Sequence, residues 1–255
     1  MSDEHGTQPV RPTLEIRRQR KTSERVARDL AGQIVEQNLA PGTRLPNERQ
    51  MTESFGIGRT TLREALRLLE TRGVITIKPG PRGGPVVRRP RPADLGEALT
   101  LMLEFERSTL DDIMHARAAL EPACARLAAD RITAADVDVL QSTIDRTLAD
   151  PHNHAVFMDA TQGFHSHIAV VAGNAVLGVF TDTLKSVTDG VLAGVRYTPN
   201  RRRAVALAHQ PIVDALQKGD ADAAVAAMSQ HLLEARRYWS RTYAELLAQP
   251  VRWSH

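Results

Sequence analysis

The sequence predicts a mainly α-helical protein in two parts: a small domain of three helices with a β-hairpin, then a larger bundle built of helices alone. Apolar residues recur at three- and four-residue steps through most of the chain. Strand-like alternation is confined to residues 74–88, and a proline-rich basic segment at 88–92 separates the two parts. With 255 residues, 42% of them apolar and 25% charged, the chain is long enough to form at least one sizeable core.

The N-terminal residues 1–20 lack apolar periodicity and end in a basic run, so we expect a disordered basic arm there. An apolar face at four-residue steps predicts a first helix from Ser23 to just before the Pro41–Gly42 turn. That face consists of Val26, Leu30 and Ile34. This helix completes the three-helix core of the first domain.

Residues 45–70 are expected to form two short helices joined by a tight turn. Asn47 can cap the first helix, with Gln50 answering it as in a capping box. The break at 56–58 ends this helix, and the second runs over 59–72 with Gly73 as its C-cap. The second helix carries one apolar stripe of Leu62, Ala65, Leu66 and Leu69.

The polar face of the second helix favours contact with DNA. Its first turn holds Arg59, Thr60, Thr61 and Arg63, where a recognition helix presents side chains to base edges and backbone amides to phosphate. The alternative is that this polar face is simply exposed to solvent and contacts no DNA. The strand-like segments 74–78 and 85–88, separated by a Pro-Gly turn, predict a hairpin beside this helix and favour the DNA-binding interpretation.

The segments LPNER (45–49) and GRTTLREALRLLETRG (58–73) resemble the winged helix-turn-helix of GntR-type bacterial transcription regulators. The resemblance implies that Arg49, Arg59 and Arg63 contact an operator together with the threonines of the recognition helix, and that the wing enters the minor groove. The wing turn contains Gly80 and Arg82, and an arginine suits a narrow, electronegative minor groove. A phosphate contact or a free surface charge is the alternative for Arg82.

Charge separates the two parts. Residues 11–91 contain 18 Lys and Arg against 8 Asp and Glu, whereas residues 92–255 contain 15 against 20. A basic first domain and an acidic second part place the double-stranded DNA partner on the first domain alone. We expect a cytoplasmic protein, because the chain shows no apolar run near 18 residues, no signal peptide, and only one cysteine, Cys124.

We expect domain boundaries at 21–89 for the winged helix-turn-helix, 90–94 for a linker and 95–247 for the helical domain, followed by a tail at 248–255. The helical domain shows no strand alternation. Short breaks between its helices suit antiparallel neighbours in a bundle. The helices are expected at 94–105, 110–130, 134–149, 154–172, 175–195, 200–217 and 221–247.

The helical domain is similar to the FCD effector domain of the FadR-like subgroup of these regulators. The residues that carry this resemblance are Arg117-x-x-x-Glu121-Pro122, Phe164-His165, Gly173-Asn174, His209-x-x-Ile212 with Gly219-Asp220, and Met228-x-x-His231-Leu232. The resemblance implies an all-helical domain that binds an effector and contributes to dimerisation.

Three histidines, His165, His209 and His231, lie on helices with apolar faces. On spacing alone, each is expected to be a core residue with one hydrogen bond. The resemblance implies instead one divalent metal per chain, Zn, Ni or Mn, held by the three histidines and an aspartate four residues before the first. Here that position is Thr161, whose neutral hydroxyl is a poor ligand. Both a three-histidine metal site and a metal-free, histidine-lined pocket therefore remain open.

Two nearby polar residues could compensate for Thr161. Asp159 points about 120° away from His165 on an ideal helix and is not a natural substitute. Gln162 faces more nearly inward, although amide oxygens rarely bind such metals.

Arg117 matches an arginine that binds the carboxylate of a small organic acid in similar effector domains, and the resemblance implies the same role here. A guanidinium suits this role because it can make two parallel hydrogen bonds to a carboxylate. The alternative is a helical ion pair with Glu121. The run Arg201–Arg203 is expected to be a solvated face. The aromatic residues near the C-terminus, Tyr238, Trp239 and Tyr243, are expected to serve packing rather than a site.

The sequence thus predicts a transcription regulator, not an enzyme: a repressor that binds a palindromic operator as a homodimer and responds to a small carboxylate, with or without metal. One alternative is a metal-free regulator that responds to acyl-CoA or fatty acids. A remote alternative is a metal-dependent hydrolase fused to a nucleic-acid module, although no HExxH or nucleophile motif is present.

Overall fold

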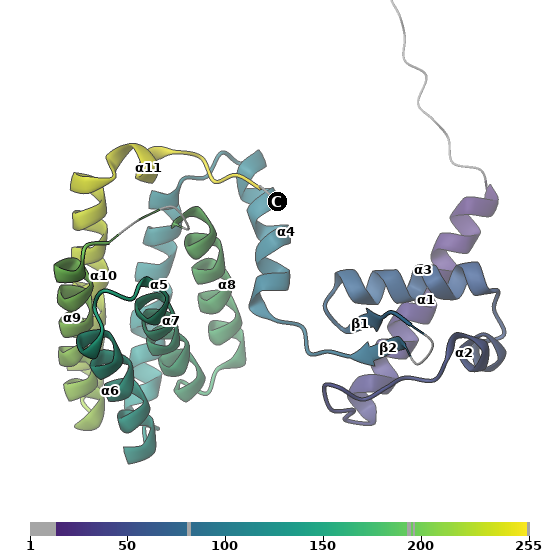
Figure 1. The fold of residues 1–255 in the computed structure, drawn as a ribbon, viewed down its shortest axis with the longest axis horizontal. Coiled ribbons are helices and arrows are strands. Elements are labelled where there is room, and N and C mark those ends of the chain that lie inside the picture. Colours follow the sequence, from purple (N-terminus) through teal and green to yellow (C-terminus); the bar gives the residue numbers. More distant parts are fainter. Residues whose placement is uncertain (1–13, 81–82, 193–194, 196, 254–255) are drawn as a thin grey trace, which may run out of the picture. The chain divides into compact units, whose positions relative to one another are not determined.

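The computed structural model describes residues 14–80, 83–192, 195 and 197–253. Figure 1 shows a mainly helical chain, which divides into two units, Met1–Asp94 and Leu95–His255. The fold class predicted from the sequence is confirmed: three helices and one β-hairpin make up the described part of the first unit, and helices alone build the second.

The first unit is built around helices α1 (Leu14–Glu36), α2 (Glu48–Phe55) and α3 (Arg59–Thr71). Strands β1 (Ile75–Lys78) and β2 (Gly84–Val87) form an antiparallel hairpin in which Ile75 pairs with Val87 and Lys78 with Gly84. The predicted apolar faces of α1 and α3 meet in one core. Its most buried members include Val26, Ala27, Leu30, Met51, Leu62, Ala65, Leu66, Leu69 and Ile75.

The turn between α2 and α3 follows the local signals of the sequence. Asn47 caps α2, and Gln50 completes the capping box, as predicted. Gly56 ends α2 with φ at 62°, in the left-handed region that glycine adopts without strain. Gly58 then caps α3 without a side-chain hydrogen bond.

The first helix is longer than predicted. Helix α1 begins at Leu14, so residues 14–20 of the expected arm are helical, and Ser23 is not its first residue. The Ser23 hydroxyl donates to the Arg20 carbonyl within the helix. The last proline before the helix is Pro12, so no residue of α1 breaks its hydrogen bonding. Residues 1–13 of the expected arm lie outside the described residues.

The second unit is a helical bundle in which α5 contacts α7, α8, α9 and α10. Small side chains such as Ala125 and Ala128 on α5 are fully buried and let the neighbouring helices approach closely. The helices are α4 (Pro92–Phe105), α5 (Leu110–Ala129), α6 (Ala134–Ala149), α7 (His154–Val171), α8 (Ala175–Leu192), α9 (Pro199–Gln217), α10 (Ala221–Thr242) and α11 (Ala244–Ala248).

Three boundaries in this unit differ from the sequence prediction. Helix α4 begins at Pro92, inside the expected linker, because proline is well suited to the first turn of a helix. The expected helix 221–247 is divided at Tyr243, where φ is −138°. The redirected chain places Leu247 in a cluster with Trp239. The expected tail is packed, since Val251 is buried and its amide donates to the Ser108 carbonyl.

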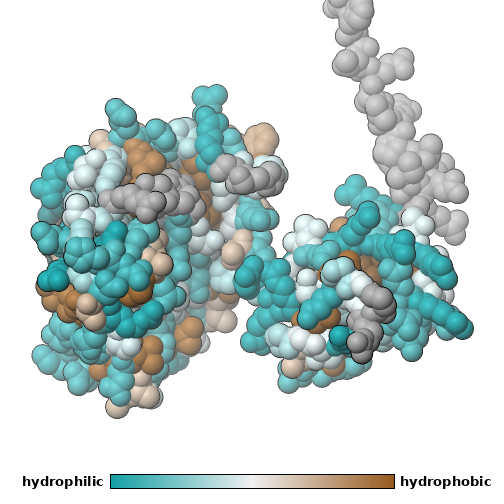
Figure 2. Space-filling model, viewed as in Figure 1, coloured by the Kyte–Doolittle hydropathy of each residue, from teal (hydrophilic) through white to brown (hydrophobic). Residues whose placement is uncertain are grey.

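Hydrophilic residues cover most of the visible face of the first unit, whereas the visible face of the second also shows apolar patches among them (Figure 2). Among the described helices, none has the length and apolar character needed to cross a bilayer.

Candidate functional site

The first turn of α3 presents the predicted recognition residues. Arg59, Thr60 and Arg63 are exposed and Thr61 is half-buried. Because no side chain caps this helix, the backbone N–H groups of its first turn are left for another partner. A helix N-terminus with free N–H groups and flanking arginines is suited to binding phosphate.

Two of the predicted arginines are held by surface carboxylates. Arg49 lies 2.9 Å from Glu53 along α2, and Arg63 lies 3.0 Å from Glu48, which joins α3 to α2. Exposed ion pairs contribute about 0–1 kcal/mol. The two guanidiniums can therefore exchange a carboxylate for a DNA phosphate at little cost.

The wing is described only in part. Gly80 follows β1 with φ at 100°, a conformation that favours glycine and lets the chain turn back towards β2. Arg82, the predicted minor-groove residue, lies outside the described residues.

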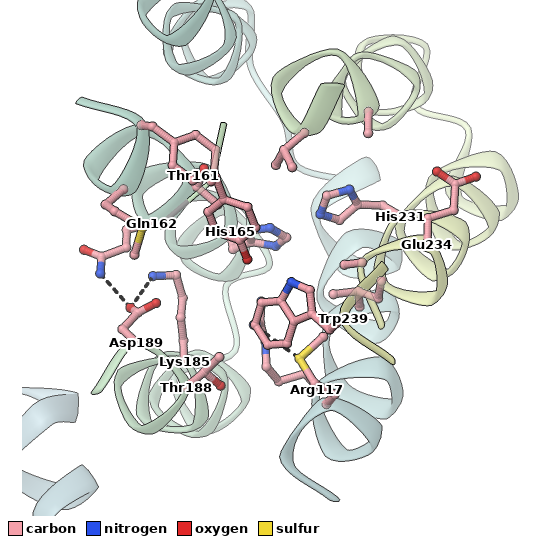
Figure 3. Close-up of a pocket in the computed structure, with 18 of the residues that line it drawn as sticks. Arg117, Thr161, Gln162, His165, Lys185, Thr188, Asp189, His231, Glu234 and Trp239 are labelled. Atoms are coloured by element: carbon pink, nitrogen blue, oxygen red, sulfur yellow. Dashed lines mark hydrogen bonds and ion pairs between the residues drawn. The ribbon is translucent and has the colours of Figure 1, made fainter. Parts of the chain in front are cut away.

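The second unit encloses a cavity of about 200 Å³ between α5, α7, α8, α9 and α10. Figure 3 labels polar side chains of the wall that come from α5, α7, α8 and α10. Arg117, His165 and His231 line it, together with Thr161 at the position where the family resemblance implies an aspartate. The other polar or aromatic residues of its wall are Phe157, Gln162, Lys185, Thr188, Asp189, Tyr197, Arg201, Glu234 and Trp239.

The three predicted histidines converge. One ring nitrogen of each lies within 4.8 Å of the others, although α7, α9 and α10 supply one residue each. His209 lies behind the cavity wall, stacked on Phe164 with ring centroids 4.0 Å apart. Its Nε2 atom is buried without a hydrogen-bond partner among the described residues. Three imidazole nitrogens this close together form a donor set that a divalent metal can bind, and the Nε2 atom of His209 has no other partner among the described residues.

Burial keeps two of these imidazoles neutral. It lowers the pKa of His209 well below the usual value, with His231 and His165 adding to the effect. Burial and the neighbouring His165 lower the pKa of His231 to about 3. Because only a neutral imidazole has a free lone pair, both residues are in the metal-binding form at neutral pH.

Glu121 connects Arg117 to His165. Its Oε1 accepts a hydrogen bond from Arg117 Nε at 2.6 Å, and its Oε2 lies 2.6 Å from His165 Nδ1. Burial alone would raise the pKa of Glu121, but the charge of Arg117 and the contact with His165 outweigh it and hold the pKa well below its usual range. Two lone pairs would repel at this distance, so we assign a proton to His165 Nδ1, which leaves Nε2 as its free ligand atom.

The remaining predicted residues occupy other positions. Asp159 pairs with Arg146 at 2.7 Å on the surface, away from the histidines as expected. Gln162 does not turn towards the histidines, because its amide donates to Asp189 at 2.6 Å. Arg117 forms the helical ion pair with Glu121 that was its alternative prediction, and it also lines the cavity. That Arg117 binds an acid stays a prediction.

Comparison with known proteins supports this assembly of two domains. Residues 22–83 match the bacterial regulatory proteins of the gntR family, and residues 112–234 match the FCD domain. The chain is 32% identical over 224 residues to the Escherichia coli K12 protein named "Putative L-lactate dehydrogenase operon regulatory protein", with 84% of each chain covered. The chain belongs to the GntR family.

Two further similarities agree with this assignment. The transcriptional repressor NanR of Citrobacter rodentium is 28% identical over 234 residues, with 86% of each chain covered. A solved structure of Streptococcus agalactiae GntR is 26% identical, matches with a TM-score of 0.66, and covers 84% of this chain and 99% of its own. This GntR-family protein is a transcription regulator rather than an enzyme, which rules out the hydrolase alternative.

Some wall residues of the regulator's cavity were not predicted as site residues. Lys185 and Asp189 lie one turn apart on α8, a spacing that in sequence resembles any surface ion pair. Trp239 lines the cavity, so the C-terminal aromatic patch serves the site as well as packing. In the sequence, only the family motifs around Arg117 and the three histidines indicated a pocket.

The run Arg201–Arg203 is not the solvated face that the sequence suggested. Arg202 is buried and donates to the carbonyls of Pro151 and His152. Arg201 lines the cavity, and of the three arginines only Arg203 is exposed. These arginines lie at the start of α9, which packs against the bundle. Successive residues of a helix point in different directions around its axis, so the three side chains have different environments.

Proposed function

We propose that this GntR-family protein is a ligand-responsive repressor that binds a palindromic operator as a homodimer and releases it when a small carboxylate enters the cavity. The observation that carries the proposal is the meeting of Arg117 and the histidine cluster at one enclosed cavity in the second unit. That position separates ligand binding from the recognition helix in the first unit.

Dimerisation follows from how winged helices read DNA. One such domain covers a half-site, and a symmetric operator pairs with a symmetric protein. The named activity of the Citrobacter rodentium relative, a transcriptional repressor, supports the repressor assignment.

A small carboxylate is the ligand class that suits the cavity. The Arg117 guanidinium lines it and can make charge-assisted hydrogen bonds to an acid group. The volume of about 200 Å³ lies below the range of about 300–1,000 Å³ for most drug-sized ligand pockets. One relative is named for an L-lactate dehydrogenase operon, and lactate is itself a small carboxylate.

We further propose that His165, His209 and His231 hold one divalent metal, Zn, Ni or Mn. The orphaned Nε2 of His209 and the contact between Glu121 and His165 support this assignment. When bound, such an ion supplies positive charge that attracts a carboxylate oxygen of the effector. The protein's own contribution is to orient the imidazoles, with Glu121 fixing the tautomer of His165.

A metal-free regulator that responds to acyl-CoA or fatty acids is the second candidate. Thr161 favours it, because the wall then lacks the anionic ligand that would strengthen a metal site. The small cavity favours the carboxylate instead. Elemental analysis of untagged protein, with and without chelator, separates the two: about one metal per chain supports the metal-assisted site, and none supports the metal-free alternative.

Release of the operator requires that the acid bind one arrangement of the protein more tightly than another. A ligand with equal affinity for the DNA-competent and DNA-incompetent arrangements does not shift the equilibrium between them. The test is footprinting of the upstream region of the protein's own gene, followed by titration with small carboxylates. We expect a protected inverted repeat that is lost on adding the effector; a single unpaired half-site or an unchanged footprint with every acid would overturn the proposal.

A further inference from the structure

Among the described residues, three positively charged side chains line the cavity, and two of them have an acidic partner. Arg117 lies 2.6 Å from Glu121, and Lys185 lies 3.2 Å from Asp189. Asp189 also accepts from the Gln162 amide, so this side of the wall is joined by hydrogen bonds (Figure 3). Each of these two cations therefore has a carboxylate partner in the protein, although Arg117 shares Glu121 with His165.

Arg201 is the third cation, and its charge is not balanced in this way. Within the described residues, no carboxylate lies within 4.0 Å of its guanidinium. Its Nε atom is buried and lacks a hydrogen-bond partner there. The acidic wall residue Glu234 is exposed, accepts from Gln230 at 2.6 Å, and points away from the cavity in Figure 3.

The guanidinium of Arg201 is held in a defined plane. Its Cζ atom lies 3.7 Å from the centre of the Tyr238 ring, a cation–π contact. Tyr238 is itself packed near Tyr197, with ring centroids 6.1 Å apart. Stacking uses the face of a guanidinium and leaves its edge N–H groups available for a planar anion.

The position of Arg201 adds to the attraction for an anion. It lies in the first turn of α9, which Thr198 caps, where the helix dipole is positive. Arg117 on α5 lines the same cavity as Arg201 on α9. An anion in the cavity is therefore attracted by both guanidiniums.

We propose that Arg201 is a second acid-binding residue and that the effector is a small dianion, with one acidic group at Arg117 and another at Arg201. This inference rests on the proposed function, in which the cavity binds a small carboxylate. A monoacid would leave the charge of Arg201 unmatched, whereas a diacid neutralises it with charge-assisted hydrogen bonds.

The experiment measures binding of matched mono- and dicarboxylates of three to six carbons, such as butyrate and succinate, to the full chain by calorimetry. Arg201→Met keeps the apolar stem on Tyr238 but removes the charge. Arg203→Met removes an exposed arginine from the same helix turn and serves as the matched control. Circular dichroism and the unfolding midpoint check that each variant folds.

We expect at least one diacid to bind the wild type at least about tenfold more tightly than its matched monoacid, since only the diacid can make charge-assisted hydrogen bonds to both guanidiniums. Arg201→Met should lose that preference without weakening the monoacid, and Arg203→Met should keep it. Tyr238→Leu, which removes the stacking partner, should lose part of the preference for the diacid.

Equal affinity for the two members of every matched pair, or an unchanged preference in Arg201→Met, overturns the inference and leaves the proposed function standing. Binding of none of these acids overturns both.

Discussion

Glu121 and His165 meet across the interface between α5 and α7, with Oε2 of the carboxylate 2.6 Å from Nδ1 of the imidazole. Both side chains are only 2% exposed, so water does not screen the contact. The same carboxylate binds Arg117 through its other oxygen. A carboxylate behind a histidine fixes the ring and raises its basicity, which is how many metal sites orient their ligands. Glu121 thus places a negative charge next to Nδ1 of His165, on the side of the ring away from the proposed metal. Thr161, at the position of the expected aspartate, supplies no such charge.

Glu121→Gln should weaken binding of Zn²⁺ by roughly tenfold to a hundredfold, because the amide oxygen can accept a hydrogen bond from His165 but carries no charge. It should also lower the free energy of unfolding by about 3 kcal/mol, since Arg117 then keeps a buried charge without a partner. Competition against a chromophoric chelator measures the metal affinity, and urea denaturation measures the stability.

The control for that change is Glu234→Gln, which removes a carboxylate from the cavity wall that is exposed and turned outwards. It should leave metal affinity within about twofold of the wild type, because an exposed charge is screened. Equal effects of the two substitutions would show that general charge, not the contact with His165, sets the affinity.

Thr161→Asp should tighten binding of Zn²⁺ by about tenfold or more, because it places an anionic oxygen one helical turn before His165, on the cavity wall. The thermal midpoint in the presence of metal should rise accordingly, since a ligand that binds only the folded state stabilises it. His167 lies outside the cluster and pairs with Asp136, so His167→Ala is the comparison that should not change metal binding. An unaltered affinity in Thr161→Asp would mean that this position does not face the metal.

Local signals predicted the fold well because they act within one turn of chain. The Asn47 capping box, the Gly56 break and the apolar faces of α1 and α3 all involve neighbours a few residues apart. The start of α1 was missed because basic residues without an apolar stripe give no periodic signal. The break at Tyr243 was missed because no proline or glycine marks it, and tertiary packing of Leu247 accompanies it.

The candidate site was predictable only where a family motif pointed to it. The three histidines lie 44 and 22 residues apart in sequence, and helical spacing alone made each an ordinary core residue. The packing of α8, α9 and α10 decides that Lys185, Arg201 and Trp239 share one cavity. Such contacts between distant helices have no signature in local periodicity.

Arg59→Ala should weaken operator binding and lower the slope of log affinity against log salt by about 1, because one phosphate contact and its released counterion are lost. Arg59 begins α3, where the backbone N–H groups are uncapped. Arg72 is exposed at the opposite end of the same helix, so Arg72→Ala has the same change in net charge and should leave the slope within experimental error. Fluorescence anisotropy over a salt series measures both. An equal loss in the two variants would indicate a diffuse electrostatic effect instead of a contact at the start of α3.

Asp111→Asn should lower the free energy of unfolding at pH 7 by about 1–2 kcal/mol, because Asp111 joins the start of α5 to Arg236 on α10 through two hydrogen bonds of 2.6 and 2.8 Å. Those bonds lower the pKa of Asp111. The pKa is lower in the folded than in the unfolded chain, where it is about 3.9, so this stabilisation is complete above pH 5 and is lost as pH falls through the folded value. The difference between wild type and variant should therefore be constant from pH 7 to 5 and shrink below pH 4.

Urea denaturation at pH 7, 5 and 3.5 measures this difference. The control is Asp222→Asn, which breaks a more exposed pair with Arg126 and should lower the free energy of unfolding by less than about 0.5 kcal/mol. A difference at pH 3.5 as large as that at pH 7 would mean that Asp111 acts through packing and not through its charge.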